Sequence, residues 1–400
     1  MNTTTAAPHP LTIDRDTLVA TIADMVRIPS VNPTLVPGAE GEAAVAQWIA
    51  ERLRQTPGID VELQDSGDGR PNVIASAGNG QGRTLLLNGH TDTVGVAGME
   101  QPYSGHVEGN RLYGRGASDM KSAMSSALLL LEAIARHGDF PGRVVVTFVT
   151  DEEHSSIGTQ AICREIARWQ PDAALVLEPT SLQACIAHKG FVWAEIVTQG
   201  FAAHGSAWQV GVDAIAHMGR VIGRLEAYAQ ELVTRPQHAL VGPPSAHLSI
   251  IHGGQELSSY PDRCHLEIER RTIPGETVAQ VQAELQQILD DLAAADPQFN
   301  ASMTLGLTRD AFAIGQEAEI VRTLARVHQA KVGSEITYVG AAGWMDSSLL
   351  DQVNVPVAIF GPGGDGAHAM VEWTDLDMDV QFADMLAQVA WEFCGGHNGG

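Results

Sequence analysis

The chain has 400 residues, with 48 Asp and Glu against 24 Lys and Arg, which gives a formal net charge of -24. At about 100–200 residues per domain, this length fits two domains or one interrupted domain and excludes a minimal binding module. A strongly acidic surface repels phosphate backbones and anionic membranes, so we expect neither a nucleic-acid partner nor a membrane partner.

The amino terminus and the cysteines indicate the compartment. Residues 1–10 are polar and lack the basic and apolar stretches of a signal peptide. No segment approaches the roughly 20 apolar residues of a membrane span. The four cysteines occur singly and without metal-binding spacing, so we expect reduced thiols and a cytoplasmic protein.

Apolar periodicity predicts alternating helices and strands in the first 181 residues. Helical patterns cover residues 16–27, 41–54, 120–137 and 158–168. Short apolar runs typical of strands cover residues 61–63, 72–75, 84–88, 144–149 and 173–177. Such alternation favours an α/β fold, with helices on both faces of a sheet.

The pattern changes between residues 182 and 305. Helical stretches at 212–232 and 278–295 are surrounded by strand-like runs at 185–186, 192–198, 248–251 and 264–271. This order is typical of an α+β sandwich with its helices on one face. The α/β pattern then resumes with helices near 317–330, 345–350 and 376–393 and a strand at 355–360. We therefore predict a mixed-sheet α/β catalytic domain in two parts, 1–181 and 306–400, interrupted by an inserted α+β domain over 182–305.

The strand at 84–88 leads directly into His90 and Asp92. A period of two places both side chains on one side, so Asp92 could hold the far ring nitrogen of His90 and orient the ring as a metal ligand. The alternative is an ordinary polar turn.

A Gly-rich turn ends at Ser118 and Asp119, where the helix at 120–137 begins. One interpretation makes Ser118 or Asp119 the N-cap of that helix. The functional interpretation is that the Asp119 carboxylate points into the same cleft as His90.

Acidic residues follow two further strands, and a histidine follows a third. Glu152 and Glu153 lie in an acidic turn after the strand at 144–149, and Glu178 ends the next strand. His368 follows a Gly-rich loop. Open α/β sheets place their sites at the carboxyl ends of strands, and neighbouring carboxylates repel one another unless a cation offsets them. A solvated acidic turn is the alternative.

Taken together, these strand ends and loops predict a metal site with nitrogen and oxygen ligands. Such ligands suit Zn²⁺, and also Co²⁺ or Mn²⁺. Two histidines and three acids are too many for one catalytic ion with an open position. A site for two ions that share a carboxylate is therefore the simplest interpretation.

Five motifs carry a family resemblance. NGHTDTV, GRGASDMKSA, TDEEHSSIG, LEPT and GGDGAHA, in this order, resemble the motif set of the M20 metallopeptidases, a family that includes deacylases and carboxypeptidases. The resemblance covers nearly the whole chain. It implies that the inserted domain is a lid or dimerisation domain, through which the chain forms a homodimer.

The resemblance also implies a ligand set for two zinc ions. His90, Asp119 and Glu178 would bind one ion, while Asp119, Glu153 and His368 would bind the other, so that Asp119 bridges the two.

Roles for two further acids come from the same resemblance. Asp92 would orient His90. Glu152 would be the general base that takes a proton from a metal-bridging water and passes it to the leaving amine.

In the inserted domain, His204 resembles the family's lid histidine, which helps to polarise the scissile carbonyl; the alternative is a surface turn residue. Arg271 resembles the lid arginine that pairs with a substrate carboxylate. Arg270 is the alternative, since neighbours on a strand face opposite sides. The sequence departs from the family pattern at Trp208, where proline is common, and at Ser122, where glycine is usual.

We therefore predict a zinc-dependent hydrolase that acts on the amide bond of small N-acyl amino acids bearing a free carboxylate. A carboxypeptidase or dipeptidase of the same family is one alternative. A non-hydrolytic metal-binding relative is the other, and the presence of Glu152 argues against it.

Overall fold

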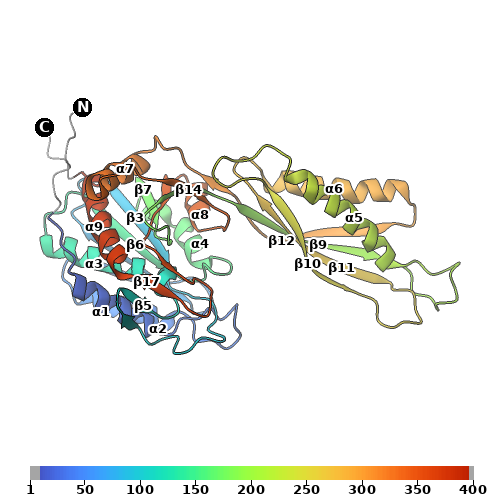
Figure 1. The fold of residues 1–400 in the computed structure, drawn as a ribbon, viewed down its shortest axis with the longest axis horizontal. Coiled ribbons are helices and arrows are strands. Elements are labelled where there is room, and N and C mark those ends of the chain that lie inside the picture. Colours follow the sequence, from blue (N-terminus) through green and yellow to red (C-terminus); the bar gives the residue numbers. More distant parts are fainter. Residues whose placement is uncertain (1–9, 396–400) are drawn as a thin grey trace. The chain divides into compact units, whose positions relative to one another are not determined.

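The computed structural model describes residues 10–395, which form two compact units (Figure 1). The first unit contains the described chain up to Ile186, then Ile314–Val339, and then the chain from Met345 onward. The second unit contains Ala187–Ala313 and Gly340–Trp344. The second unit is thus an insertion in the first. Residues 1–9, which include most of the segment inspected for a signal peptide, lie outside the described residues.

A mixed sheet forms the centre of the first unit. Strand β3 runs parallel to β6 and β7, and β7 runs parallel to β15, whereas β1, β2 and β6 pair antiparallel. This confirms the predicted mixed sheet. The strand order is β1 (Asp60–Asp65), β2 (Pro71–Gly78), β6 (Arg143–Val149), β3 (Thr84–His90), β7 (Ala173–Val176), β15 (Val357–Ile359), β8 (Ala184–His188) and β13 (Phe312–Ala313), with β14 (Tyr338–Ala341) also pairing with β8.

Helices cover both faces of this sheet, as predicted. In β3, the face of Gly89 contacts the side chains of Met120 and Met124, which lie just before and within α3. The side chain of the preceding residue, Asn88, donates a hydrogen bond to Thr159 of α4. Because neighbouring residues on a strand face opposite sides, these two helices lie on opposite faces. The helices are α1 (Arg15–Val26), α2 (Ala43–Arg54), α3 (Ser122–His137), α4 (Ile157–Arg164), α7 (Glu319–Val332), α8 (Ser347–Gln352) and α9 (Leu376–Phe393).

Among the predicted helices whose bounds differ from the structure, two show a change of backbone conformation or helix type at the boundary. The helix expected from residue 120 begins at Ser122, because the preceding η1 (Ala117–Lys121) contains non-helical backbone. The helix expected over 158–168 is α4 followed by a short 3-10 turn, η2 (Ile166–Arg168).

A second, smaller sheet in the first unit was not predicted. Its strands have only two or three residues, which is too short for an alternating pattern to be recognised. The sheet brings the segment before Asp119 next to the segment after His368. Its order is β16 (Gly364–Asp365), β17 (Trp373–Asp375), β5 (Arg111–Tyr113) and β4 (His106–Glu108).

The second unit is an antiparallel sheet with two helices on one face, which agrees with the predicted α+β arrangement. Helices α5 (Ala214–Leu232) and α6 (Val278–Ala295) share an apolar core with one side of the sheet. The sheet order is β10 (Ser245–Gly253), β11 (Arg263–Thr272), β9 (Gly190–Gln199) and β12 (Asn300–Arg309).

The cysteines and the apolar character of the helices were also considered in the sequence, and both lie within residues 10–395. None of the four cysteines, all of which lie in this range, forms a disulfide. No helix in the range combines the length and the apolar character needed to cross a membrane.

The buried Asp379 of α9 makes the stability of the first unit dependent on pH. Its side chain accepts a hydrogen bond from Thr374, and burial raises its pKa to about 8. In the unfolded chain, an aspartic acid has a pKa of about 3.9. Between the two pKa values the folded chain binds one more proton than the unfolded chain, so the folded state loses stability as pH rises. We expect Asp379→Asn to be more stable than the parent at pH 8, with the gap shrinking toward pH 4.

Urea unfolding at several pH values measures this gap. One titrating group changes the free energy of unfolding by at most about 1.4 kcal/mol per pH unit. A difference between the two proteins that does not vary with pH would contradict the assignment.

Candidate active site

The end of strand β3 positions the first group of candidate ligands. His90 is buried, with β3 held between β6 and β7. Its Nε2 lies 3.0 Å from Asp119 Oδ1 and 3.8 Å from Glu178 Oε1. The candidate ligand atoms of these three residues lie within 4.8 Å of one another, close enough to hold one metal ion.

Asp119 also belongs to a second group. Its other oxygen, Oδ2, lies 3.4 Å from His368 Nε2, which in turn lies 3.1 Å from a carboxylate oxygen of Glu153. These three residues likewise offer ligand atoms within 4.8 Å of one another. In the described part of the chain, these are the two groups that could hold a metal ion. Asp119 therefore presents one oxygen to each histidine.

The N-cap interpretation of Asp119 is wrong. Helix α3 begins at Ser122, and the preceding Lys121 occupies the cap position without a capping side-chain bond. Asp119 lies outside the helix, with φ -120° and ψ 93°. An extended residue at this point turns its carboxylate to the two histidines rather than to the helix amides.

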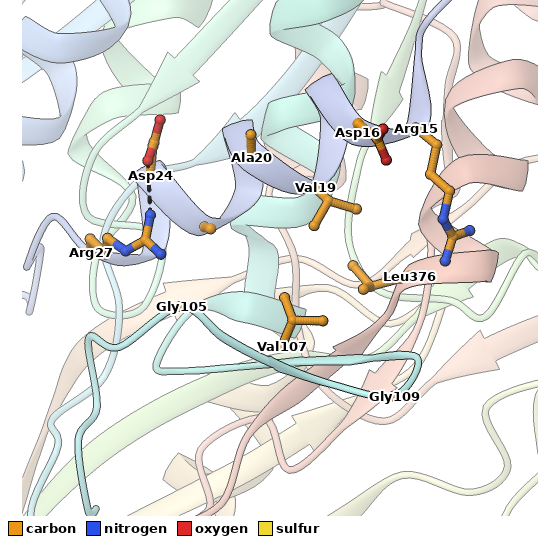
Figure 2. A pocket seen from close by; sticks show the side chains of 11 residues that line it. Arg15, Asp16, Val19, Ala20, Asp24, Arg27, Gly105, Val107, Gly109 and Leu376 are labelled. Carbon is orange, nitrogen blue, oxygen red and sulfur yellow. Dashed lines mark hydrogen bonds and ion pairs between the residues drawn. The ribbon is translucent and has the colours of Figure 1, made fainter.

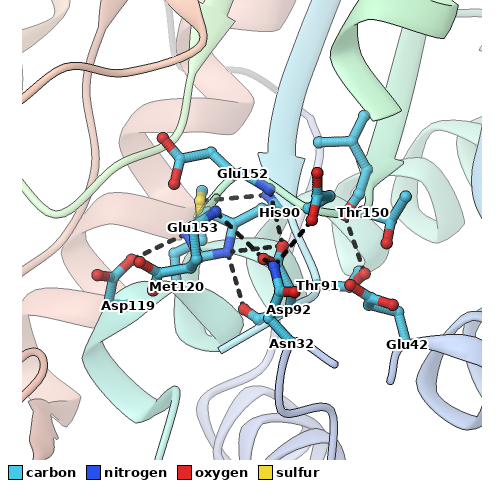
Figure 3. Close-up of polar contacts among 12 residues, drawn as sticks. Asn32, Glu42, His90, Thr91, Asp92, Asp119, Met120, Thr150, Glu152 and Glu153 are labelled. Atoms are coloured by element: carbon cyan, nitrogen blue, oxygen red, sulfur yellow. Dashed lines mark hydrogen bonds and ion pairs between the residues drawn. The ribbon is translucent and has the colours of Figure 1, made fainter. Parts of the chain in front are cut away.

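Asp92 lies beside His90, but its strongest contacts differ from the prediction. The ring Nδ1 of His90 bonds to the backbone carbonyl of Asp92 at 2.9 Å, and the Asp92 carboxylate is 3.6 Å from that nitrogen. Because a carbonyl oxygen only accepts, Nδ1 carries hydrogen and Nε2 is the available ligand atom. The carboxylate instead accepts the backbone N–H groups of Glu152 and Glu153, at 3.1 and 3.2 Å (Figure 3).

A buried polar network supports this turn, and sequence reasoning missed it. Asn32 donates to both Asp92 and Asp151, at 2.8 and 3.0 Å. Arg70 donates to Asp151 at 2.6 Å and to both carboxylate oxygens of Glu42. These partners are between 28 and 119 residues apart in the chain, so no local motif indicates them.

The electrostatics of the site reflect crowded carboxylates. Burial first, and neighbouring acids second, raise the pKa of both Glu152 and Glu178 well above the usual range. Hydrogen bonds to Asp119 and Glu153 raise the pKa of His368 to about 10. Burial opposes ionisation of Asp119, yet its bonds with His368 and His90 lower its pKa overall. The cluster therefore favours bound protons or cations.

Glu152 belongs to neither group of candidate ligands. The charges of Glu178, Asp346 and Glu153 contribute to its raised pKa, so its carboxyl lies close to theirs. A partly buried acid next to a cluster of candidate metal ligands, but outside it, is placed for proton transfer.

The donor set fits divalent metal ions. It consists of imidazole nitrogens and carboxylate oxygens without thiolates, a combination that suits Zn²⁺, Co²⁺ or Mn²⁺. The surplus of buried carboxylates supplies the negative charge that two cations would neutralise.

Two predicted residues lie in the second unit. His204 is exposed, and its Nδ1 bonds to the Ser206 hydroxyl at 2.8 Å. Arg271 pairs with Glu269 at 3.0 Å and lies over the ring of Phe191. For both residues, these contacts are with other residues of the second unit.

The alternation of strand β11 separates Arg271 from Arg270. Arg270 is fully buried and bonds to Glu276 and to the hydroxyl of Tyr228. Arg271 lies on the opposite side of the strand and is partly exposed. Arg271 is thus the better candidate for binding a ligand.

A surface pocket of about 480 Å³ lies elsewhere in the first unit, beside α1 (Figure 2). Its polar lining includes Arg15, which pairs with Asp377, and Arg27, which pairs with Asp24. Of the described residues that line it, none is a predicted site residue. We therefore place the candidate chemistry at the ends of the central strands.

An α/β sheet that collects two sets of candidate nitrogen and oxygen ligands at its strand ends is typical of metal-dependent hydrolases. Residues 86–392 match the model of peptidase family M20/M25/M40. The chain is 30% identical to the acetylornithine deacetylase of Erwinia tasmaniensis, over 84% of this chain and 88% of that protein. The chain belongs to peptidase family M20/M25/M40.

Two further comparisons agree with this membership. The acetylornithine deacetylase of Myxococcus xanthus is 28% identical over 95% of this chain and 98% of its own length. A crystal structure of an aminopeptidase from Bacillus cereus superposes with a TM-score of 0.77 at 16% identity, covering 95% of this chain and 99% of that one. The latter similarity shows a shared fold.

The contribution of the buried polar network around Arg70 to the stability of the protein can be tested. We expect Arg70→Met to lower the free energy of unfolding by about 3–5 kcal/mol, because it leaves two buried carboxylates without their cation. Urea unfolding measures the change.

Arg168→Met is the matched control. Arg168 also pairs with a glutamate, Glu62, but both side chains are largely exposed. This variant should change the stability by less than about 1 kcal/mol. Equal losses in the two variants would contradict the importance of the buried network.

Proposed function

We propose that the chain hydrolyses the amide bond of small N-acyl amino acids, releasing a carboxylic acid and an amine. The observation that carries this proposal is the pair of three-residue groups sharing Asp119, with the partly buried Glu152 beside them. Membership of peptidase family M20/M25/M40 supports the hydrolytic chemistry. The two deacetylase relatives support a deacylase rather than a peptidase.

The residues of the two groups would hold two metal ions. His90 and Glu178 would complete one site, and Glu153 and His368 the other, with Asp119 common to both. When bound, the ions would acidify water and polarise the substrate carbonyl. The ligand chemistry supports zinc as the first choice, with cobalt or manganese as alternatives.

Glu152 is the proposed general base. Its carboxylate accepts a proton from the attacking water, whose oxygen adds to the carbonyl carbon. The carbon–nitrogen bond then breaks, and Glu152 returns the proton to the amine. Asp92 keeps Glu152 and Glu153 in place through their backbone N–H groups.

The second unit supplies the remaining proposed roles. We propose that the inserted domain, predicted over 182–305, is a lid and dimerisation domain of a cytoplasmic homodimer. Its edge strand β10 has exposed apolar side chains at Ile250 and Ile251, which supports contact with a second copy. His204 would stabilise the oxyanion, and Arg271 would pair with the carboxylate of the substrate.

Replacing Glu152 by glutamine tests the function. The amide cannot accept the proton, so we expect turnover of N-acetylornithine and other N-acetyl amino acids to fall by about 10²–10⁴-fold. Zinc content, measured by mass spectrometry, should stay at that of the parent. Retained turnover would refute the role of Glu152, and parent activity on dipeptides alone would favour the peptidase.

A second test addresses the shared ligand. Asp119→Ala should lose both metal ions, because each group loses a ligand, whereas Glu178→Ala should lose only one. Calorimetric titration of the metal-stripped proteins with zinc gives the number of ions bound. Loss of a single ion from Asp119→Ala would contradict the bridging role.

A further inference from the structure

We propose that Glu372 is a positioning residue that fixes the second metal group by joining the loop of Asp119 to the segment of His368. This inference rests on the proposed function, because it concerns the ligands of the proposed metal ions. Glu372 lies four residues after His368 and was not among the predicted site residues.

Four hydrogen-bond donors converge on the buried carboxylate of Glu372. Its Oε1 accepts the backbone N–H groups of Ser118 and Asp119, at 3.0 and 3.1 Å. Its Oε2 accepts the backbone N–H of Gly116 at 3.0 Å and an Nη1 hydrogen of Arg115 at 2.6 Å. A single side chain thus holds the backbone of the whole loop that ends in Asp119.

Arg115 connects the same loop to the neighbour of His368. Its Nη2 donates to the backbone carbonyl of Ala369 at 2.8 Å, and its guanidinium is as buried as the Glu372 carboxylate. The backbone N–H of Gly114 adds a bond to the carbonyl of Glu372 at 3.1 Å. The two segments, about 250 residues apart in sequence, are therefore joined by both side chains and backbone.

The second metal group needs such a connection because packing does not hold His368. The His368 side chain is 55% exposed, and the next residues of its loop, Met370 and Val371, are exposed as well. In the first group, by contrast, His90 ends a central strand and Glu178 follows another. Losing Glu372 should therefore weaken the second group more than the first.

The carboxylate cannot be replaced by an amide of the same shape. Each oxygen of Glu372 accepts two donors. Glu372→Gln replaces one oxygen by an NH₂ group, which donates and therefore cannot accept from the two donors that face it. Because the volume is unchanged, the variant tests the hydrogen bonds rather than the packing.

The matched control is Glu132→Gln. Glu132 is also a buried glutamate paired with an arginine, Arg52, at 2.9 Å. It lies on α3, and its described bonds go to Arg52 and Arg136 rather than to either metal-bearing segment.

The experiment is calorimetric titration of the metal-stripped proteins with Zn²⁺. The parent and Glu132→Gln should bind two ions per chain. Because Asp119 is common to both groups, Glu372→Gln should bind both ions more weakly, and the second ion should lose the most, about 10–100-fold, the usual loss when a residue that orients a ligand is changed. Excess zinc should then restore its kcat, which a misfolded protein would not show.

Three results are decisive. Two ions bound by Glu372→Gln with parent affinity, or equal weakening of both ions, would overturn the positioning role. A parent protein that binds no pair of ions would instead refute the proposed function. If Glu372→Gln does not fold by circular dichroism, Arg115→Lys replaces it. That variant keeps the charge but loses the fork that reaches both Glu372 and Ala369, and it should weaken the second ion more than the first.

Discussion

Repulsion among buried carboxylates is the constraint on which the site depends. Acidic side chains gather at the ends of the central strands, where water cannot screen them. The protein separates them into two kinds. Asp92, Asp151 and Glu372 accept several N–H donors each and serve as scaffold. Asp119 and Glu178 face histidines and each other, and these are the groups that cations can neutralise.

Sequence patterns could indicate the candidate ligands because each follows a recognisable strand or Gly-rich loop. His90 ends an apolar strand and Glu178 follows another, and parallel strands bring their carboxyl ends to one edge. The scaffold residues could not be predicted in this way. Asn32 and Glu372 act on residues 60 to 257 positions away, and nothing in their local sequence differs from an ordinary loop. Long-range hydrogen bonds leave no periodic signal.

A local rule of helix capping failed at Asp119. An aspartate before a helix is a good N-cap, yet Asp119 has extended backbone and leaves the cap position to Lys121. The choice between Arg270 and Arg271 also needed the structure. Strand alternation in the sequence leaves either arginine as the candidate for binding a ligand, and only the burial of Arg270 against Tyr228 distinguishes them. The short strands of the second sheet were missed for lack of length, although they bring the Asp119 and His368 segments together.

The two proposed metal sites are built unequally, and this has a functional consequence. In the first, His90 ends a central strand and Glu178 follows another, so the ladder bonds of these strands position both residues. The second takes His368 from an exposed loop, held by the contacts of Arg115 and Glu372. A ligand on a loop can adjust more cheaply than one on a strand, because fewer packed neighbours must move with it. We therefore expect the second proposed site to exchange its ion and to adjust to a substrate more readily than the first.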